Sequence, residues 1–365
     1  MSSSNSTTGT GTGRRIVVLG AGYAGLTAAK GAARHRSVTL VAPEERLLHR
    51  IRQHETAAGR GRDWPAIEEL ARGRRIRHHR ARAVDLDLAG HKVALDDGTT
   101  LGYDTLVYAL GSRTAWHDVP GAVEHAHPVE HADDVRRLIR EADRPGTLAV
   151  VGGGATGIEL ATELAEAHPA WRVRIVSAGQ VGGIYSPKGR AHIRRVLDRL
   201  GVDVHEDATV TEVTPDGLRT TAGPITADLT VWAASMEPHP LAARAGLAVD
   251  DRGRALVDDH LRSVSHPDVH VVGDAAAVTV PGIGTLRMGC ATALPRGQYV
   301  GKLLDGRTTE PFSFRYVVHC LSLGRRDGLL QLVHPDDSMK PTVLTGAAGR
   351  LAKAAIVGVV FSSLK

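Results

Sequence analysis

Two stretches of the chain share one pattern of apolar and small residues. Residues 14–30 read RRIVVLGAGYAGLTAAK and residues 147–163 read TLAVVGGGATGIELATE. Each places a short apolar strand before a glycine-rich turn and an Ala-rich stretch with helical periodicity. A second apolar strand follows in each case, at residues 38–41 and 173–176. The pattern predicts two right-handed βαβ units, so we expect an α/β protein with two doubly wound, Rossmann-like nucleotide-binding domains.

The remaining pattern predicts how these domains are divided along the chain. Residues 83–107 alternate as strands around the turn at residues 96–98, and residues 105–110 form an apolar strand. Residues 133–142 are helix-like, and the apolar strand at residues 269–272 favours a return to the first domain. We predict a discontinuous first domain (residues 14–117 and 251–310), a second domain (residues 118–250) and a small C-terminal α+β interface unit (residues 311–365), with strands at residues 312–319 and 329–333.

Composition restricts the class of protein. The chain has 365 residues, 42% hydrophobic and 23% charged, which is typical of a globular protein with several cores. No run of 18 uncharged apolar residues predicts a membrane span. Residues 1–13 are mostly Ser, Thr, Gly and Asn, so we expect a disordered tail and no secretory signal. Two cysteines, Cys290 and Cys320, form no metal or disulfide pattern, which favours a cytoplasmic protein without a metal site.

The formal net charge of +5 raises the question of a nucleic-acid partner. The densest basic stretch, residues 72–82 (RGRRIRHHRAR), contains only Ile76 as a bulky apolar residue and no aromatic residue that could stack on bases. A solvated or phosphate-facing edge explains this stretch better. We therefore expect no nucleic-acid partner.

The glycine turns have the spacing that dinucleotide binding requires. In Gly20-x-Gly22-x-x-Gly25, the first glycine permits a tight turn, the second lets the backbone approach a pyrophosphate, and the third lets the helix pack on the strand. The helix N-terminus then faces the phosphates. Residues 152–157 repeat the motif at Gly152, Gly154 and Gly157. Two such turns in one chain predict a donor and an acceptor dinucleotide.

Neither unit has an acidic residue directly at the end of its second strand, where a carboxylate would bind a ribose. Ala42 and Ser177 occupy these positions. In the first unit, Glu44 or Glu45 is near enough to supply the missing ribose-binding carboxylate. In the second unit, Lys188 or Arg190 could approach a 2′-phosphate, so NADPH is as plausible as NADH.

Four motifs in order along the chain resemble one known family. GAGYAG (residues 20–25), YALGS (residues 108–112), GGGATGIELATELAE (residues 152–166) and VVGDAAA (residues 271–277) look like the FAD/NAD(P)-linked reductases, closest to their type II NADH dehydrogenase-like branch. The resemblance covers residues 14–331. It implies a glutathione-reductase-like arrangement, with FAD in the first domain and NAD(P)H in the second.

The resemblance also implies which residues hold each cofactor. For FAD these are Gly20, Gly22, Tyr23, Ala24, Gly25, Glu44, Ala83, Val84, Ala109, Leu110, Gly111, Gly273, Asp274, Ala293 and Leu294. For NAD(P)H they are Gly152, Gly154, Ala155, Thr156, Gly157, Glu159 and Ser177. In relatives the carboxylate matching Glu159 lies near nicotinamide and flavin, so Glu159 is our candidate catalytic residue, to orient the carboxamide or assist a proton step. A solvated helix face is the alternative for Glu159, because acidic residues are favoured in a first helical turn.

A helix is expected after residue 288, with Pro295 in its first turn and its N-terminal dipole near the flavin. Cys290 in this segment is expected to be an unreactive buried thiol.

Departures from the family pattern restrict the chemistry. Residues 21–51 contain no cysteine pair, which excludes a dithiol relay there. The type II dehydrogenases carry glutamines at the quinone end of the helix after the Gly-Asp motif, whereas this chain has only Gln298 there. Those relatives also finish with amphipathic membrane helices. The composition of residues 351–365 is compatible with a short interfacial helix that touches the membrane. The alternatives are a packed terminal helix or a contact between two copies in a homodimer.

The resemblance predicts an enzyme that passes hydride from NAD(P)H to flavin N5 and then to a small-molecule acceptor, with a quinone as first choice. One alternative is a tailoring flavoenzyme that reduces, oxidises or oxygenates a biosynthetic intermediate. The other is a slow-turnover redox sensor resembling apoptosis-inducing factor.

Overall fold

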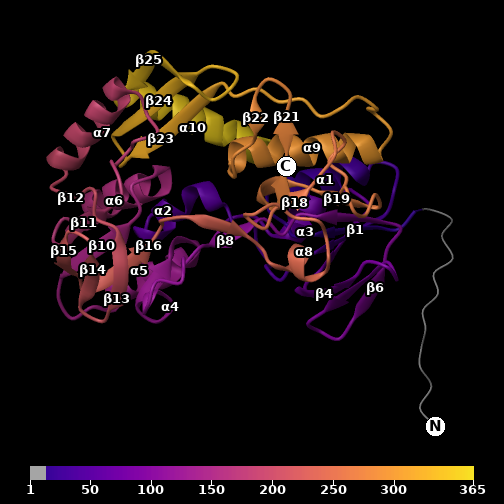
Figure 1. Ribbon diagram of the computed structural model, residues 1–365, viewed down its shortest axis with the longest axis horizontal. Coiled ribbons are helices and arrows are strands. Elements are labelled where there is room, and N and C mark those ends of the chain that lie inside the picture. The colour runs from indigo at the N-terminus through magenta and orange to yellow at the C-terminus, as the bar shows by residue number, and fades with distance from the viewer. Residues whose placement is uncertain (1–13) are drawn as a thin grey trace, which may run out of the picture.

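The computed structural model describes residues 14–365, so the tail predicted for residues 1–13 lies outside the described residues. Figure 1 shows two α/β units side by side, with a third, smaller unit lying across them at the C-terminal end of the chain. Among the described residues, no helix has both the length and the apolar character needed to cross a membrane.

The first unit is built on a five-stranded parallel sheet in the order β19-β7-β1-β2-β3. Its strands are β1 (Ile16–Leu19), β2 (Val38–Val41), β3 (Ile76–His79), β7 (Thr105–Tyr108) and β19 (Val269–Val271). The chain moves outward from β1 through β2 to β3, then returns to pair β7 on the other side of β1. The strand order therefore reverses beside β1, where open parallel sheets bind ligands at the carboxyl ends of their strands.

The second unit repeats this plan. Its parallel sheet has the order β12-β11-β10-β16-β9. The strands are β9 (Ala126–Pro128), β10 (Thr147–Val151), β11 (Arg172–Val176), β12 (Asp203–His205) and β16 (Leu229–Trp232). Both glycine turns thus follow the central strand of a parallel sheet. The apolar pattern predicted the two βαβ units, and the structure adds the central position of their first strands.

Helices and small antiparallel sheets surround the two parallel sheets. The helices in these units are α1 (Tyr23–Ala32), α2 (Gln53–Ala57), α3 (Ile67–Ala71), α4 (Ala122–His125), α5 (Ala132–Glu141), α6 (Ala155–Ala167), α7 (Pro187–Arg199), α8 (Leu241–Arg244) and α9 (Cys290–Leu304). The three-stranded sheets are β4 (Ala83–Asp87), β5 (Lys92–Leu95) and β6 (Thr100–Gly102), and β13 (Val210–Thr214), β14 (Gly217–Thr220) and β15 (Gly223–Thr226). β8 (Ser112–Thr114) pairs antiparallel with β17 (Met236–Pro238) where the chain passes between the units. Short pairs involve β18 (Ala255–Leu256), β20 (Ala276–Ala277), β21 (Thr279–Val280) and β22 (Gly284–Thr285).

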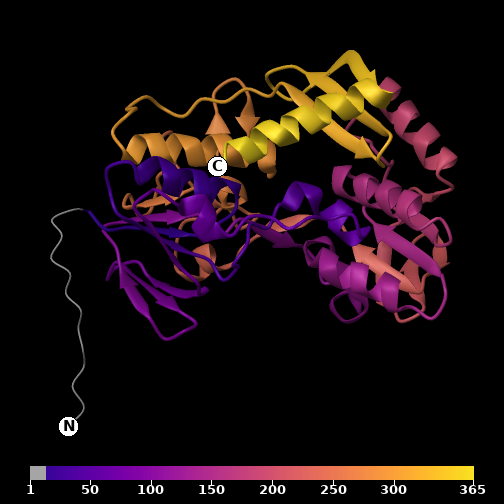
Figure 2. The same ribbon diagram turned by 180° about the vertical axis from the view of Figure 1, so that it is seen from behind.

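The third unit is a three-stranded antiparallel sheet followed by a long helix. It comprises β23 (Val318–Leu323), β24 (Asp327–Val333), β25 (Met339–Thr345) and α10 (Gly346–Ser362). α10 packs against β24 and runs toward the first unit, where Leu364 is fully buried in the core. Figure 2 shows this helix crossing from the C-terminal sheet to the first unit. The predicted strand at residues 312–319 was wrong for residues 312–317, which have no regular structure; there Phe312 and Tyr316 anchor an irregular connection by packing into the core.

α1 and α9 make the closest helix contact of the first unit. A Cβ on Gly31 would lie 2.6 Å from the Gly301 Cα, and one on Gly297 would lie 2.1 Å from the Ala24 carbonyl oxygen. Small residues thus allow α9 to press against the helix that follows the first glycine turn. The prediction that Pro295 lies in the first turn of α9 was wrong: the helix begins at Cys290, so Pro295 is inside it. Gly289 is the N-cap, so the helix begins several residues earlier than a helix with Pro295 in its first turn would.

Candidate functional site

The first glycine turn joins β1 to α1 and leaves one face of its backbone open. Gly20 has φ +98°, and a Cβ there would lie 2.5 Å from the Ala109 carbonyl oxygen. A Cβ on Gly25 would lie 1.9 Å from the Gly20 oxygen, whereas a Cβ on Gly22 would meet nothing within 4 Å. The outer glycines therefore close the turn on the sheet, and Gly22 gives an approach to the backbone from outside. This is the arrangement that a pyrophosphate requires.

Most of the other residues expected at FAD follow strands of this same sheet. Glu44 is exposed three residues after β2, and residues 109–111 directly follow β7. Gly273 follows β19, and a Cβ on it would contact the Cβ atoms of Ala24 (3.2 Å) and Ala293 (3.9 Å). The structure thus brings the glycine turn, the Gly-Asp motif and α9, which carries Leu294, to one edge of the sheet.

Asp274 is the hydrogen-bonding centre of this edge. Its Oδ1 accepts from the Gly289 N–H at 2.7 Å, and its Oδ2 accepts from the Ser112 hydroxyl at 2.7 Å. Arg296, which is fully buried, donates to the Gly273 carbonyl oxygen at 2.5 Å. Asp274 thereby ties the segment after β7 to the start of α9. Arg296 was not identified from the sequence as a site residue. The available signal was a charged residue between Pro295 and Gly297 within the expected helix.

Three further residues expected at FAD are Ala83, Val84 and Tyr23. Ala83 and Val84 begin β4, beyond the end of β3, and Val84 is exposed. The backbone of Tyr23 lies at the glycine turn, but its hydroxyl hydrogen-bonds with Nδ1 of buried His49 at 2.7 Å. His49 in turn packs edge-on against Trp64. The Tyr23 side chain is therefore part of the protein core.

The second glycine turn, between β10 and α6, repeats the geometry of the first. Gly152 has φ +126°, and its Cβ would lie 2.5 Å from the Ala233 oxygen. A Cβ on Gly157 would lie 1.8 Å from the Gly152 oxygen, and one on Gly154 would meet nothing within 4 Å. Ala155 and Thr156 open α6 directly after this turn. Both units therefore offer an open second glycine at a helix N-terminus, which fits one dinucleotide in each.

Glu159 is buried on α6, and it bonds to the third unit. Its carboxylate Oε1 accepts hydrogen bonds from the Lys353 ammonium on α10 and, at 2.8 Å, from the Ser322 N–H on β23. The alternative of a solvated helix face for Glu159 was wrong, because the first turn of α6 contains no acidic residue and Glu159 lies one turn further along.

Two nitrogen bases surround the Glu159 carboxylate. Burial lowers the pKa of Lys353 to about 7. His54 on α2 places its Nδ1 3.7 Å from Glu159 Oε2, and burial together with the nearby Lys353 charge holds the His54 pKa well below its usual range. The His54 Nε2 has no hydrogen-bond partner within residues 14–365. A group with a pKa near neutrality beside a buried carboxylate can hold or release a proton at working pH.

The second acidic residue of α6, Glu163, belongs to an ion-pair network. It is almost fully buried and pairs with Arg60 (3.2 Å) and Arg325 (2.9 Å), and Arg325 also reaches Glu55 (3.8 Å). Burial raises the Glu163 pKa. These pairs join α2, α6 and the turn between β23 and β24.

A cavity of about 130 Å³ opens beside this network. Ile51, Ala354 and Val357 supply its apolar wall, while its polar wall includes His54, Lys353 and Arg350. Sequence reasoning missed Lys353 and His54 as site residues. A lysine within the otherwise apolar stretch LAKAAIVGVV was the signal for Lys353; the sequence offered none for His54.

The two cysteines are free thiols, and burial raises the pKa of Cys290 to about 11 and that of Cys320 to about 12. Neither is poised as a thiolate at neutral pH, which agrees with the expectation of an unreactive Cys290.

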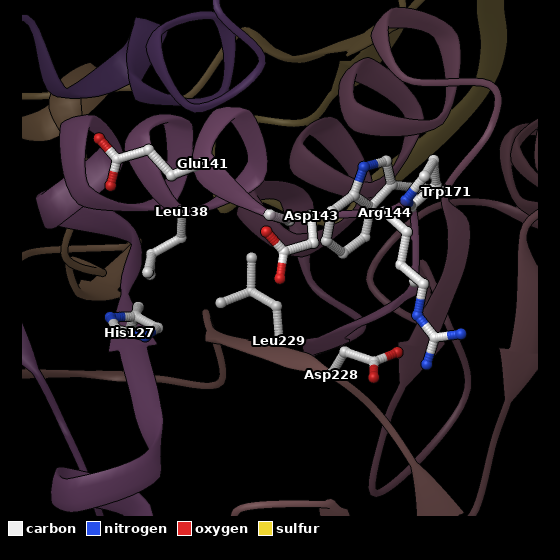
Figure 3. A pocket seen from close by; sticks show the side chains of 11 residues that line it. His127, Leu138, Glu141, Asp143, Arg144, Trp171, Asp228 and Leu229 are labelled. Atoms are coloured by element: carbon white, nitrogen blue, oxygen red, sulfur yellow. The ribbon is translucent and has the colours of Figure 1, made fainter.

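A larger hollow of about 530 Å³ lies in the second unit, and Figure 3 shows the side chains that line it. Its lining includes His127, Leu138, Asp143, Trp171 and Asp228. It lies where β10 and β16 begin, and Asp228 accepts a hydrogen bond from the Thr147 N–H there. Dinucleotides bind at the opposite, carboxyl end of such strands, so this hollow is not the cofactor site.

The order of motifs and the doubled parallel sheets match a known protein family. The model of the pyridine nucleotide-disulphide oxidoreductases matches residues 14–294. The chain belongs to this family.

Curated relatives point to one branch of the family. The NADH dehydrogenase-like protein Rv1812c of Mycobacterium tuberculosis is 29% identical over 315 residues, which is 79% of each chain. The type II NADH:quinone oxidoreductase Ndh of the same organism is 27% identical, covering 74% of this chain and 68% of the relative. Among solved structures, NDH2 from Plasmodium falciparum in complex with NADH superimposes with a TM-score of 0.81 over 96% of each chain at 13% identity, which shows a shared fold. The relatives support NADH-to-quinone oxidoreduction as the activity of this branch.

Proposed function

We propose that the protein is an FAD-dependent NAD(P)H:quinone oxidoreductase of glutathione-reductase-like arrangement. FAD binds residues 14–117 and 251–310, NAD(P)H binds residues 118–250, and residues 311–365 form an interface unit beside both. FAD, when bound, supplies the redox centre that takes two electrons from the nicotinamide and passes them to the acceptor.

The matching geometry of the two glycine turns carries this proposal. In each turn the first and third glycines leave no space for a side chain, while Gly22 and Gly154 remain open. Two dinucleotides in one chain are what electron transfer between nicotinamide and flavin requires. We assign Asp274, whose carboxylate accepts hydrogen bonds from Ser112 and Gly289, as a ligand for the flavin's ribityl and phosphate end.

Glu159 and Lys353 supply the proton chemistry. Reduction of a quinone to a quinol consumes two protons, and the positioned acid works best when its pKa is near the operating pH. The Lys353 pKa of about 7 meets this condition. The pair is largely buried, and Lys353 also lines the cavity between α2, α6 and α10, where an acceptor could contact its ammonium. We assign the acceptor to this cavity.

A quinone as acceptor is supported by the relatives, one of which is named a type II NADH:quinone oxidoreductase. The cavity agrees with an aromatic acceptor, because one wall is apolar (Ile51, Ala354, Val357) and the other carries hydrogen-bond donors (His54, Lys353).

The test is steady-state oxidation of NAD(P)H with a menaquinone analogue. Wild-type protein is expected to turn over, and Glu159→Gln and Lys353→Met are expected to lower kcat roughly 10²-fold or more, the usual size of a lost acid–base group. Glu141→Gln on the exposed end of α5 is the matched carboxylate control and is expected to retain full activity. Absence of quinone-dependent turnover in a flavin-loaded wild-type protein would contradict the proposed acceptor.

A further inference from the structure

The segment after β11 lies directly on the second glycine turn. Ser177 follows β11, and a Cβ on Gly153 would lie 2.3 Å from the Ser177 Oγ. The Gly182 N–H donates to the Gly153 carbonyl oxygen at 2.8 Å, which holds this segment against the turn. In a βαβ dinucleotide unit, the end of the second strand lies beside the ribose of the adenosine, so Ser177 marks the ribose 2′ position.

This segment has no carboxylate for the ribose hydroxyls. Residues 177–197 contain no Asp or Glu, although Ala178, Gly179 and Gln180 are exposed. The first unit differs, since Glu44 and Glu45 stand within four residues of the end of β2. A carboxylate at this place binds a 2′-hydroxyl and repels a 2′-phosphate. Within the segments that directly follow the second strands, only the first unit therefore has acidic residues that could select an unphosphorylated ribose.

A guanidinium is held beside the same segment. Arg190, in the first turn of α7, donates from Nη1 to the Gln180 side-chain oxygen at 2.6 Å. Arginine has five N–H donors in a planar fork that matches a phosphate. Lys188, exposed at the start of α7, adds a second positive charge.

The nearest carboxylate on the neighbouring strand is already engaged. Glu206 follows β12, accepts from the Val181 N–H at 2.7 Å and pairs with Arg194 at 2.5 Å. Its charge is therefore balanced by protein groups beneath the segment.

We infer that Ser177, Gln180 and Arg190 form a 2′-phosphate subsite, so that the enzyme uses NADPH in preference to NADH. This inference rests on the proposed function, because it needs a nicotinamide dinucleotide at the second glycine turn. The expected preference is about tenfold or more in kcat/KM, which is about 1.4 kcal/mol of transition-state binding.

The subsite is tested first by binding, without turnover. Isothermal titration of the flavin-loaded protein compares 2′,5′-ADP with 5′-AMP, which lacks the 2′-phosphate. We expect at least tenfold tighter binding of 2′,5′-ADP and loss of that difference in Arg190→Ala. Arg195→Ala removes an exposed arginine from another face of the same helix and is expected to keep the difference. Ser177→Glu is expected to weaken 2′,5′-ADP and to shift kcat/KM toward NADH.

The outcomes separate this inference from the proposed function. Equal binding of both nucleotides, or an undiminished difference in Arg190→Ala, overturns the subsite while leaving a nicotinamide site in place. Failure of either nucleotide to bind, together with failure of NADH and NADPH to reduce the flavin, overturns the proposed function itself. Unchanged flavin content in each variant shows that the fold is retained.

Discussion

Replacing Lys353 by Met is expected to destabilise the protein strongly. The substitution keeps a flexible apolar side chain in the same volume but removes the ammonium that contacts Glu159 Oε1. Glu159 then keeps one direct donor, the Ser322 N–H, in a largely buried site. Removing one partner of a buried ion pair costs about 3 to 5 kcal/mol, because the remaining charge is left without compensation. The cost falls on the contact between α10 and α6, which connects the third unit to the second.

The expected loss is measured by urea-induced unfolding of wild type, Lys353→Met, Glu159→Gln and the double variant at pH 6, below the Lys353 pKa of about 7, where Lys353 is protonated. The double variant removes both charges and is expected to regain much of the lost stability. Residues in direct contact give coupling free energies of about 0.5 to 3 kcal/mol in such a cycle. A loss below about 1 kcal/mol for Lys353→Met, or additive effects in the double variant, would refute the assignment of a stabilising buried pair.

Other expectations concern catalysis and the cofactor turns. Because burial places the Lys353 pKa at about 7, below its value of 10.5 in water, protonated Lys353 is lost as the pH rises through 7. Quinone-dependent kcat should therefore fall above pH 7 in wild type, and Lys353→Met should lose this pH dependence. An unchanged pH profile in the variant would assign the proton to another group. A Cβ on Gly154 has open space, so Gly154→Val should leave the free energy of unfolding within about 0.5 kcal/mol of wild type but raise the KM for NAD(P)H. A Cβ on Gly157 would lie 1.8 Å from a backbone oxygen, so Gly157→Val should lower the melting temperature. Equal stability of the two variants would contradict the turn geometry. Asp274→Ala should reduce the flavin content of the purified protein, because Gly289 and Ser112 lose their shared acceptor; full flavin occupancy would remove Asp274 from the site.

The repeated elements could be predicted from sequence because their local signals agree. Strand, glycine turn, helix and second strand occur together twice, and each signal predicts the same βαβ unit. The strands at residues 38–41 and 173–176 lie within β2 and β11. The Gly273-Asp274 pair follows β19, as the apolar pattern before it predicted.

Contacts between distant segments left no such local signal. Glu159 and Lys353 are 194 residues apart, and neither the helix around Glu159 nor the one around Lys353 indicates that they meet. Residues 312–317 have strand-like composition, yet their aromatic side chains serve as anchors in the core of the first unit. The start of α9 was misplaced because proline frequency predicts a first-turn position, whereas Gly289, with φ +151°, determines where this helix begins.

The most direct test of the account is the visible spectrum of the purified protein during anaerobic addition of NADPH, then NADH in a second sample, followed in each by a menaquinone analogue. The account predicts a flavin absorption band that bleaches with the nicotinamide and recovers when the quinone is added, faster with NADPH than with NADH. A protein without flavin, or a flavin band that neither nicotinamide bleaches, would contradict the central claim that the two glycine turns hold FAD and NAD(P)H for electron transfer.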